Sequence, residues 1–178
     1  FYNFEVKKFN KSSGWTIDLE RFFAHFTADQ IRYTIGANAP ESSDSEFTWE
    51  DFQMRVNGDL VGKYGNFANR TLTFIDSKVG AGAIAAESYD EIDQTFLSDI
   101  ERLSVEIRDS FEQFKVRQAC AQIMQLATLG NVYFDQKKPW VLIKDKELKG
   151  ELMTMLSCCL HCLKVMALVS YPVIPEAA

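Results

Sequence analysis

Apolar side chains recur three or four residues apart along four long segments of the chain, as they do on one face of an α-helix. The segments span residues 48–75, 88–114, 116–138 and 148–169. Because the connections between them are short, the four helices are expected to pack as antiparallel neighbours. The pattern therefore predicts a mainly α fold built around an antiparallel α-helical bundle.

Residue types that favour helix ends mark the limits of these segments. Thr48, with Asp51 in the first turn, resembles a helix N-cap. Ser88 and Glu91 form a candidate capping box for the second helix. Pro139 blocks the third helix, since proline lacks the amide donor and clashes with the preceding turn.

The apolar stripes give the predicted core positions. In the first helix these are Phe52, Val56, Leu60, Tyr64, Phe67, Ala68, Leu72 and Ile75. In the second they are Ile92, Phe96, Ile100, Leu103, Ile107, Phe111 and Phe114. In the third they are Val116, Ala119, Cys120, Ile123, Ala127, Gly130 and Phe134. In the fourth they include Leu152, Met155, Leu156, Cys159, Cys162 and Met166.

The N-terminal part of the chain follows a different pattern. It holds an aromatic run, a Ser-Ser-Gly turn at residues 12–14 and one expected helix at about 28–35. Residues 40–46 have the composition of a loop and mark the best internal boundary. We therefore expect an appended segment at residues 1–45 and the helical bundle at residues 46–178.

Composition and charge narrow the classes of function. The 178 residues are 47% hydrophobic and 13% aromatic, which is ample for a packed core and excludes a disordered chain. The formal net charge of -6 argues against unspecific binding of polyanions, so any contact with RNA must be local.

One candidate for local contact with RNA is the lysine-rich stretch at residues 131–150, whose simpler interpretation is a solvated surface. Its lysines are Lys137, Lys138, Lys144, Lys146 and Lys149.

The cysteines indicate a reducing compartment rather than a disulfide framework. Three of the four are crowded at residues 158–162, and no secretory pattern is present. A zinc site there lacks a second ligand pair, so core packing of Cys159 and Cys162 is the favoured interpretation. His161 and Lys164 make the last helix a core helix rather than a membrane span. We expect a cytoplasmic protein with no membrane segment and no metal in this chain.

Two places offer groups suited to nucleic-acid recognition. Asn66 and Arg70 lie one helical turn apart and could hydrogen-bond a base edge and its phosphate. They continue a polar row that begins with Arg55, Asp59 and Lys63, and the alternative to base recognition is a solvated helix face.

Trp140 follows Pro139 and lies between lysines. It is either a stacking platform for an unpaired base or a core side chain that closes the bundle.

Five motifs in order resemble the C-terminal part of bacterial-type methionyl-tRNA synthetases, over nearly the whole chain. Residues 8–12 (KFNKS) stand where the family has its KMSKS signature loop, and residues 29–33 (DQIRY) resemble its DxLRY helix. Residues 47–57 (FTWEDFQMRVN), 65–71 (GNFANRT) and 131–140 (NVYFDQKKPW) resemble its WEDFxxRVN, GNLxNRT and NxYxDxxxPW motifs.

The resemblance implies a small stem-contact region followed by an α-helical anticodon-binding bundle. It assigns Trp140 to stacking on the anticodon, and Asn66 and Arg70 to reading its first base, the cytosine of CAU. Asn131 and Asp135 match positions that border this pocket. Asp135 is expected either to orient Arg70 or to accept a hydrogen bond from the cytosine amino group.

The resemblance also implies a larger parent enzyme, a class I ligase that attaches methionine to its tRNA with ATP and magnesium. Zinc is a further candidate cofactor of that parent enzyme. Lys8, Lys11 and Ser12 match the ATP-binding loop, although Phe9 and Asn10 depart from the family pattern. No other part of the nucleotide-binding domain is present, so no catalytic residue is assigned and the chain alone is expected to be inactive. The chain starts without Met, and we expect further sequence N-terminal to it.

The expected partners are methionine tRNA and the catalytic domain of the parent chain, while the sequence leaves the oligomeric state open. The alternative function is a helical protein-interaction scaffold that does not bind RNA, with Trp140 as an interface anchor.

Overall fold

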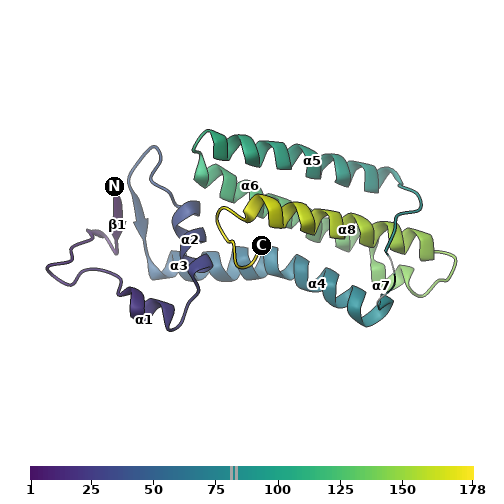
Figure 1. Ribbon diagram of the computed structural model, residues 1–178, viewed down its shortest axis with the longest axis horizontal. Coiled ribbons are helices and arrows are strands. Elements are labelled where there is room, and N and C mark those ends of the chain that lie inside the picture. The colour runs from purple at the N-terminus through teal and green to yellow at the C-terminus, as the bar shows by residue number, and fades with distance from the viewer. Residues whose placement is uncertain (81, 83) are drawn as a thin grey trace.

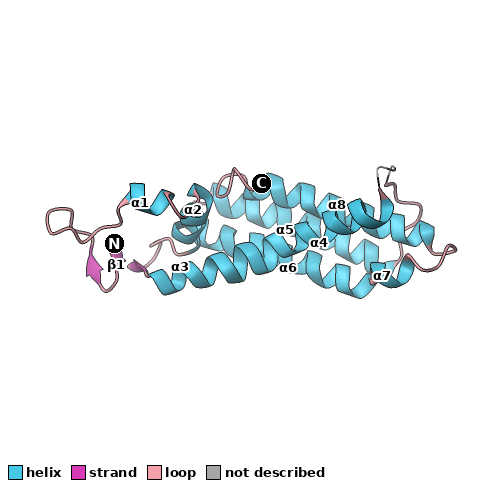
Figure 2. Cartoon of the chain, turned by 90° about the horizontal axis from the view of Figure 1, so that it is seen from below, coloured by secondary structure: helices cyan, strands magenta, loops and turns pink. Residues whose placement is uncertain are grey.

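The computed structural model describes residues 1–80, 82 and 84–178. Four long helical rods lie side by side and alternate in direction, and a small unit with the N-terminus lies at one end (Figure 1). All strands are confined to that end, while the rest of the described chain is helical or loop (Figure 2). The predicted mainly α bundle is confirmed.

The first rod is a continuous run of helix that changes type three times. It comprises α3 (Trp49–Arg55), the π-helix η1 (Val56–Gly65), α4 (Asn66–Phe74) and the π-helix η2 (Ile75–Val79). The other rods are α5 (Glu91–Glu112), α6 (Val116–Lys137) and α8 (Lys149–Ser170), with the single turn α7 (Pro139–Leu142) between the last two. A π-helical turn contains more residues than an α-helical turn, so η1 changes which side chains face the bundle.

The N-terminal unit combines a three-stranded sheet with two helices. Strand β1 (Tyr2–Phe4) pairs antiparallel with β2 (Lys7–Lys8) and parallel with β3 (Ser45–Phe47). Helices α1 (Leu19–Phe23) and α2 (Ala28–Ala37) lie between β2 and β3 in sequence. The expected helix at 28–35 is confirmed as α2, and the expected boundary at residue 45 falls at the start of β3.

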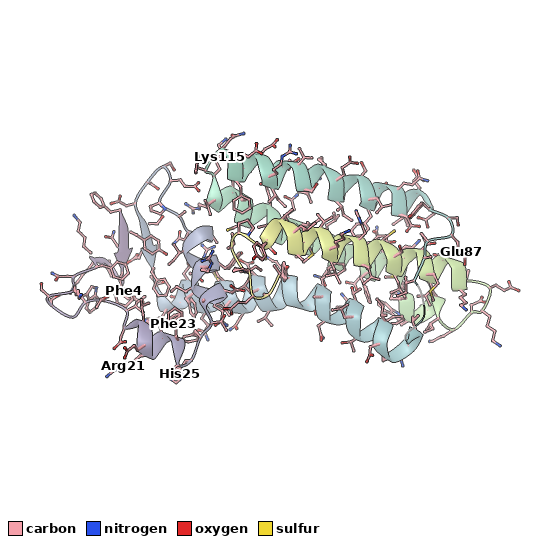
Figure 3. All side chains as sticks on the ribbon, in the orientation of Figure 1. Phe4, Arg21, Phe23, His25, Glu87 and Lys115 are labelled. Carbon is pink, nitrogen blue, oxygen red and sulfur yellow. The ribbon has the colours of Figure 1, made fainter. Side chains whose placement is uncertain are left out.

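An aromatic cluster forms the core of the N-terminal unit. Phe22, Phe47 and Phe52 are buried in it, and Trp49 contacts all three at centroid distances of 5.4 to 6.1 Å. Phe4, labelled in Figure 3, lies in the same unit. The buried residues of this small core form a cluster of their own, and the partly buried Leu60 packs against both this cluster and the main core of the bundle.

Helix α2, which carries the motif at residues 29–33, forms hydrogen bonds with the last residues of the chain. The buried carboxylate of Asp29 accepts hydrogen bonds from the backbone amides of Glu176 and Ala177 at 2.9 and 2.8 Å. The guanidinium of Arg32 donates to the carbonyls of Pro172 and Val173. Both motif residues therefore have structural partners here.

The predicted helix starts are correct in one case and wrong in the other. Thr48 Oγ1 accepts from the Asp51 amide at 3.0 Å, as predicted. The capping box of α5 is formed by Asp90 and Asp93 instead of Ser88 and Glu91, with reciprocal bonds of 2.9 and 3.1 Å. Aspartate is as good an N-cap residue as serine. The Asp93 carboxylate also accepts a hydrogen bond from the hydroxyl of the buried Tyr133.

Three predicted core positions are exposed. Leu72 is 53% exposed because the π-helical segments shift the helix face, and Thr71 is buried in its place. Ile92 is 42% exposed in the first turn of α5. Phe114 is 84% exposed because it lies after the end of α5, in a left-handed turn with φ of 57°.

Helix α8 is long and apolar enough to cross a membrane by length and composition. In the bundle its apolar stripe is buried against α5 and α6, so the prediction of a core helix is confirmed. Cys159 and Cys162 are fully buried, which confirms core packing. Burial raises the pKa of Cys162 to about 12, so its thiol stays protonated at neutral pH.

A buried lysine joins three rods at the α7 end of the bundle. The Lys137 ammonium, with a side chain 2% exposed, lies 2.7 Å from Asp90, 3.1 Å from Asp93 and 3.4 Å from Glu151. Burial alone lowers the pKa of Lys137, but its hydrogen bonds to Asp90 and Asp93 outweigh this and raise it. Tyr133 donates a further bond of 2.6 Å to Asp93. The expectation that Lys137 belongs to an exposed basic patch is therefore wrong.

Helix α6 packs against the Phe67 ring of α4 at Gly130. A Cβ atom at that position would lie 2.6 Å from the ring of Phe67, which is fully buried. No real Cβ contact is this short, so the packing of α4 on α6 requires glycine at position 130.

We expect Gly130→Ala to destabilise the fold by about 1–3 kcal/mol, because the added methyl group displaces a buried ring. The matched control is Gly58→Ala, where a Cβ atom meets nothing within 4 Å. Alanine there is expected to be neutral or stabilising by up to about 1 kcal/mol. Urea unfolding of both variants checks this, and equal stabilities would contradict it.

Candidate nucleic-acid interface

Two polar residues of α4 face two polar residues of α6. Asn66 and Arg70 lie one turn apart on α4, and Asn131 and Asp135 lie one turn apart on α6. Asn66 Nδ2 donates to Asn131 Oδ1 at 2.8 Å, and Arg70 donates to both Asn131 and Asp135. The structure thus brings these four predicted residues together in one hydrogen-bonded cluster, which we call the α4–α6 cluster.

Asn131 is held by bonds to both rods. Its amide nitrogen donates to the carbonyls of Lys63 and Ala127, each at 3.0 Å. Its amide oxygen accepts from Asn66 and, at 3.5 Å, from Arg70. The Lys63 carbonyl belongs to η1, so the π-helical segment supplies part of the site.

The Arg70 guanidinium is fixed on two sides. It forms an ion pair with Asp135 and lies over the Phe134 ring, 4.6 Å from its centroid. The hydrogen bond from Arg70 lowers the pKa of Asp135. Because the Arg70 side chain is still 27% exposed and that of Asp135 59% exposed, an external ligand can reach both.

Trp140 occupies the adjoining turn. Lys138 ends α6 in a left-handed conformation with φ of 47°, and the buried Pro139 begins α7. The Trp140 ring lies 6.4 Å from the Phe134 ring and is 43% exposed. Its packing is thus one-sided, and it does not close the core.

The buried Phe134 ring contacts the Arg70 guanidinium, the Trp140 ring and the Phe74 ring, and so connects them. The apolar pattern predicted Phe134 as a core position of the third helix, with no part in the site. Its position next to Asp135 and three residues after Asn131 was the available signal.

The side chains of the polar row predicted on the first rod have two kinds of partner: carboxylates of the same rod, or residues of α6. Arg55 pairs with Asp51, and Lys63 pairs with Asp59, each at 2.7 Å. Asp59 also accepts from the Tyr33 hydroxyl of α2 at 2.8 Å; burial and the nearby Asp59 raise the pKa of Tyr33. Among the described contacts, the side chains of the row that enter the α4–α6 cluster are those of Asn66 and Arg70, while Lys63 contributes its backbone carbonyl.

The predicted ATP-loop residues lie at the opposite end of the molecule from α7 (Figure 1). Lys8, Lys11 and Ser12 are exposed. The loop is closed by paired backbone bonds of 2.9 Å between Asn10 and Trp15, and Ser12 donates to the Asn10 side chain. They are therefore not part of the α4–α6 cluster.

Comparison with known proteins identifies the family. Residues 84–178 match the family model described as "Anticodon binding domain of methionyl tRNA ligase". The chain belongs to this family. Residues 1–72 of this anticodon-binding chain match a second model, "tRNA synthetases class I (M)". The α4–α6 cluster draws one pair of residues from each matched region.

The similar proteins are longer than this chain. The chain is 53% identical to a methionine–tRNA ligase of Protochlamydia amoebophila and 40% identical to one of Chlamydia muridarum, over its whole length in both cases. It covers 26% and 32% of those relatives, and therefore spans about a third of their length or less.

Solved structures share the fold. Methionyl-tRNA synthetase of Mycobacterium tuberculosis in complex with methionyl-adenylate matches with a TM-score of 0.89 and 24% identity. That match covers 98% of this anticodon-binding chain and 35% of the other. The apo form of the same enzyme matches with a TM-score of 0.83 and 25% identity, over 90% and 33% of the two chains.

We expect Asn131→Asp to destabilise this domain by about 1–3 kcal/mol, since a carboxylate would face the Lys63 and Ala127 carbonyls without a donor. Asn69→Asp is the matched control, because the Asn69 side chain accepts a bond from Thr73 and an aspartate accepts it equally well. Thermal or urea unfolding measures the difference. Equal loss of stability in both variants would contradict the bridging role of Asn131.

Proposed function

We propose that this chain is the tRNA-reading part of a methionine–tRNA ligase and that it recognises the CAU anticodon. The observation that carries the proposal is the α4–α6 cluster beside the half-exposed Trp140, within a domain of the anticodon-binding family. Recognition of this kind acts on unpaired bases, which stack on aromatic side chains and are read at their edges.

Trp140 is the stacking platform in this proposal. Its exposed ring offers a face to an unpaired base, and the Phe134 contact keeps the ring in place without RNA. A platform that is already ordered loses less conformational entropy when it binds. The gain per stacked base is about 1–3 kcal/mol.

Asn66 and Arg70 read the cytosine in this proposal. Cytosine presents acceptor atoms at O2 and N3 and a donor at its amino group, so amide and guanidinium donors suit it. The existing pair between Arg70 and Asp135 supports the orienting role for this carboxylate. A uracil would leave one of these donors without a partner in the complex, and such mismatches are the source of strong discrimination.

The parent activity extends the proposal beyond this chain. Attachment of methionine to tRNA requires ATP, and Lys8, Lys11 and Ser12 would contact its phosphates once the catalytic domain is present. Methionine tRNA and that catalytic domain are the proposed partners, and the cytoplasm is the proposed location. Within residues 1–80, 82 and 84–178, there is no group of three or more His, Cys, Asp or Glu side chains that could hold a metal ion.

We expect Trp140→Ala to weaken binding of a CAU anticodon stem-loop by about 1–3 kcal/mol, roughly 5- to 150-fold. A cytosine-to-uracil change at the first anticodon base should cost a similar amount. Tyr171→Ala is the control, because Tyr171 is exposed and lies at the other end of α8. Binding is measured in the full-length protein at several salt concentrations, since electrostatic contacts depend strongly on salt.

Indifference to both changes would exclude anticodon reading at this site. Capture of protein partners without any tRNA binding would instead favour a helical interaction scaffold.

We expect Lys11→Ala in the full-length protein to slow methionine-dependent pyrophosphate exchange by about 100-fold or more, as for removal of one group that stabilises developing charge. Stem-loop affinity should not change, because the loop lies at the far end of the chain. Lys7→Ala is the neighbouring control: Lys7 lies over the Trp15 ring and outside the matched motif. Equal rates for both variants would refute the assignment.

A further inference from the structure

Two residues of the predicted ATP-binding loop depart from the family pattern, and the structure gives each of them a partner. Phe9 and Asn10 stand between Lys8 and Lys11, where the KMSKS pattern has Met and Ser. The chain between β2 and α1, which holds this loop, projects away from the four rods (Figure 1). Its conformation therefore depends on contacts that the loop makes within itself and with β1.

Residues 10–15 form a closed hairpin. The backbone amide of Asn10 donates to the Trp15 carbonyl, and the amide of Trp15 donates to the Asn10 carbonyl, each at 2.9 Å. Between them, the Gly14 amide donates to the Lys11 carbonyl at 3.2 Å, and Gly14 has a φ of 73°, which favours glycine. Lys11 is thus the first residue of a four-residue turn whose two ends are joined by the Asn10–Trp15 pair.

The Asn10 side chain bonds to two residues of this turn. Its amide oxygen accepts from the Ser12 hydroxyl at 2.8 Å and from the Ser13 backbone amide at 3.2 Å. Asparagine is suited to this position because its side chain bonds to backbone donors further along a turn, and serine does the same more weakly. Asn10 in place of the pattern's Ser therefore stabilises the turn that follows it.

Two aromatic rings attach the base of the hairpin to β1. The Phe9 ring stacks on the Phe4 ring, with the centroids 5.5 Å apart and 14° between the planes. The Trp15 ring contacts the same Phe4 ring at 5.6 Å, and its indole nitrogen donates to the Phe4 carbonyl at 2.8 Å. Phe4 belongs to the aromatic core of the N-terminal unit, so this core holds both sides of the hairpin.

A closed turn reduces what must be ordered when Lys11 binds an anion. Lys11 is exposed, so its side chain keeps its rotamer freedom until a phosphate binds it. If the backbone of the turn were also free, binding would have to order both. A turn that is already closed leaves only the side chain to order, which lowers the entropy cost of binding.

We propose that Phe9, Asn10 and Trp15 are positioning residues for the reaction with ATP: they hold the Lys11 turn in one conformation before ATP binds. The inference rests on the proposed function, which assigns Lys11 to the ATP phosphates, and adds the residues that hold this lysine in place. It also assigns a role to the two residues that differ from the family pattern.

The contribution of Phe9 is measured in the full-length protein by methionine-dependent pyrophosphate exchange. Because Phe9 is 42% exposed, Phe9→Ala leaves the core of the N-terminal unit filled. It should lower kcat/KM for ATP about three- to tenfold, the range expected for loss of one aromatic stacking contact, and leave the KM for methionine unchanged. Phe9→Tyr, which keeps the ring, should restore the native value.

Phe23→Ala is the matched control for Phe9→Ala. Phe23, labelled in Figure 3, is 49% exposed in the same unit and contacts one neighbouring ring, that of Phe22, at 5.5 Å. Its removal makes the same change in side-chain size outside the hairpin. Exchange kinetics should therefore stay at the native value in Phe23→Ala.

A double-mutant cycle separates positioning from general stability. If Phe9 acts through Lys11, Phe9→Ala should have a further effect of less than about twofold in a Lys11→Ala background. Trypsin gives a second readout, because a turn that opens is cut after Lys11. Cleavage there should be about threefold or more faster in Phe9→Ala and in Asn10→Ala than in Phe23→Ala.

The two proposals fail in different ways. An exchange rate for Lys11→Ala equal to that of Lys7→Ala refutes the ATP assignment, and the positioning proposal fails with it. If Lys11→Ala is slow, the positioning proposal alone is overturned by any of three results. These are exchange kinetics for Phe9→Ala equal to those of Phe23→Ala, an effect of Phe9→Ala that persists in full without Lys11, or equal cleavage after Lys11 in all three phenylalanine and asparagine variants.

Discussion

The contact between Phe67 and Gly130 is the constraint on which the α4–α6 cluster depends. Phe67 fills the space that a side chain at position 130 would occupy, so α6 can pack against this ring only with glycine at position 130. Asn66 precedes Phe67 and Asn131 follows Gly130, and the close contact therefore sets these two amides within hydrogen-bond distance. Buried packing of this kind adopts one arrangement rather than a range, which keeps the polar atoms in register.

The buried Lys137 fixes the other side of the interface. It neutralises part of the charge of three carboxylates from the start of α5 and from α8, and removal of Lys137 would leave the buried Asp93 charge uncompensated. Because Lys137 is the last residue of α6, it also fixes where that helix ends and where the left-handed Lys138 turns the chain into α7. Trp140 is thus positioned by a buried ion cluster that lies behind the proposed binding surface.

Charge is distributed unevenly over this anticodon-binding chain. The Arg70 charge is paired with Asp135 and the Lys137 charge is buried, while Lys78, Lys146 and Lys149 have no carboxylate partner among the described contacts. In the proposed function, this distribution suits base contacts near Trp140. It also agrees with a chain whose overall charge disfavours unspecific binding to polyanions.

The sequence by itself determined the helices, the apolar faces of three rods, the Thr48 cap and the break at Pro139, because these depend on local periodicity and on residue chemistry. The ordered motifs also identified Asn66, Arg70, Asn131, Asp135 and Trp140 as one set of residues. Only the tertiary structure decided where α5 begins, which face of the first rod is buried, and that Lys137 lies inside. Those outcomes depend on contacts between residues far apart in the chain, such as Asp93 with Tyr133, and on π-helical turns that an α-helical period does not reveal.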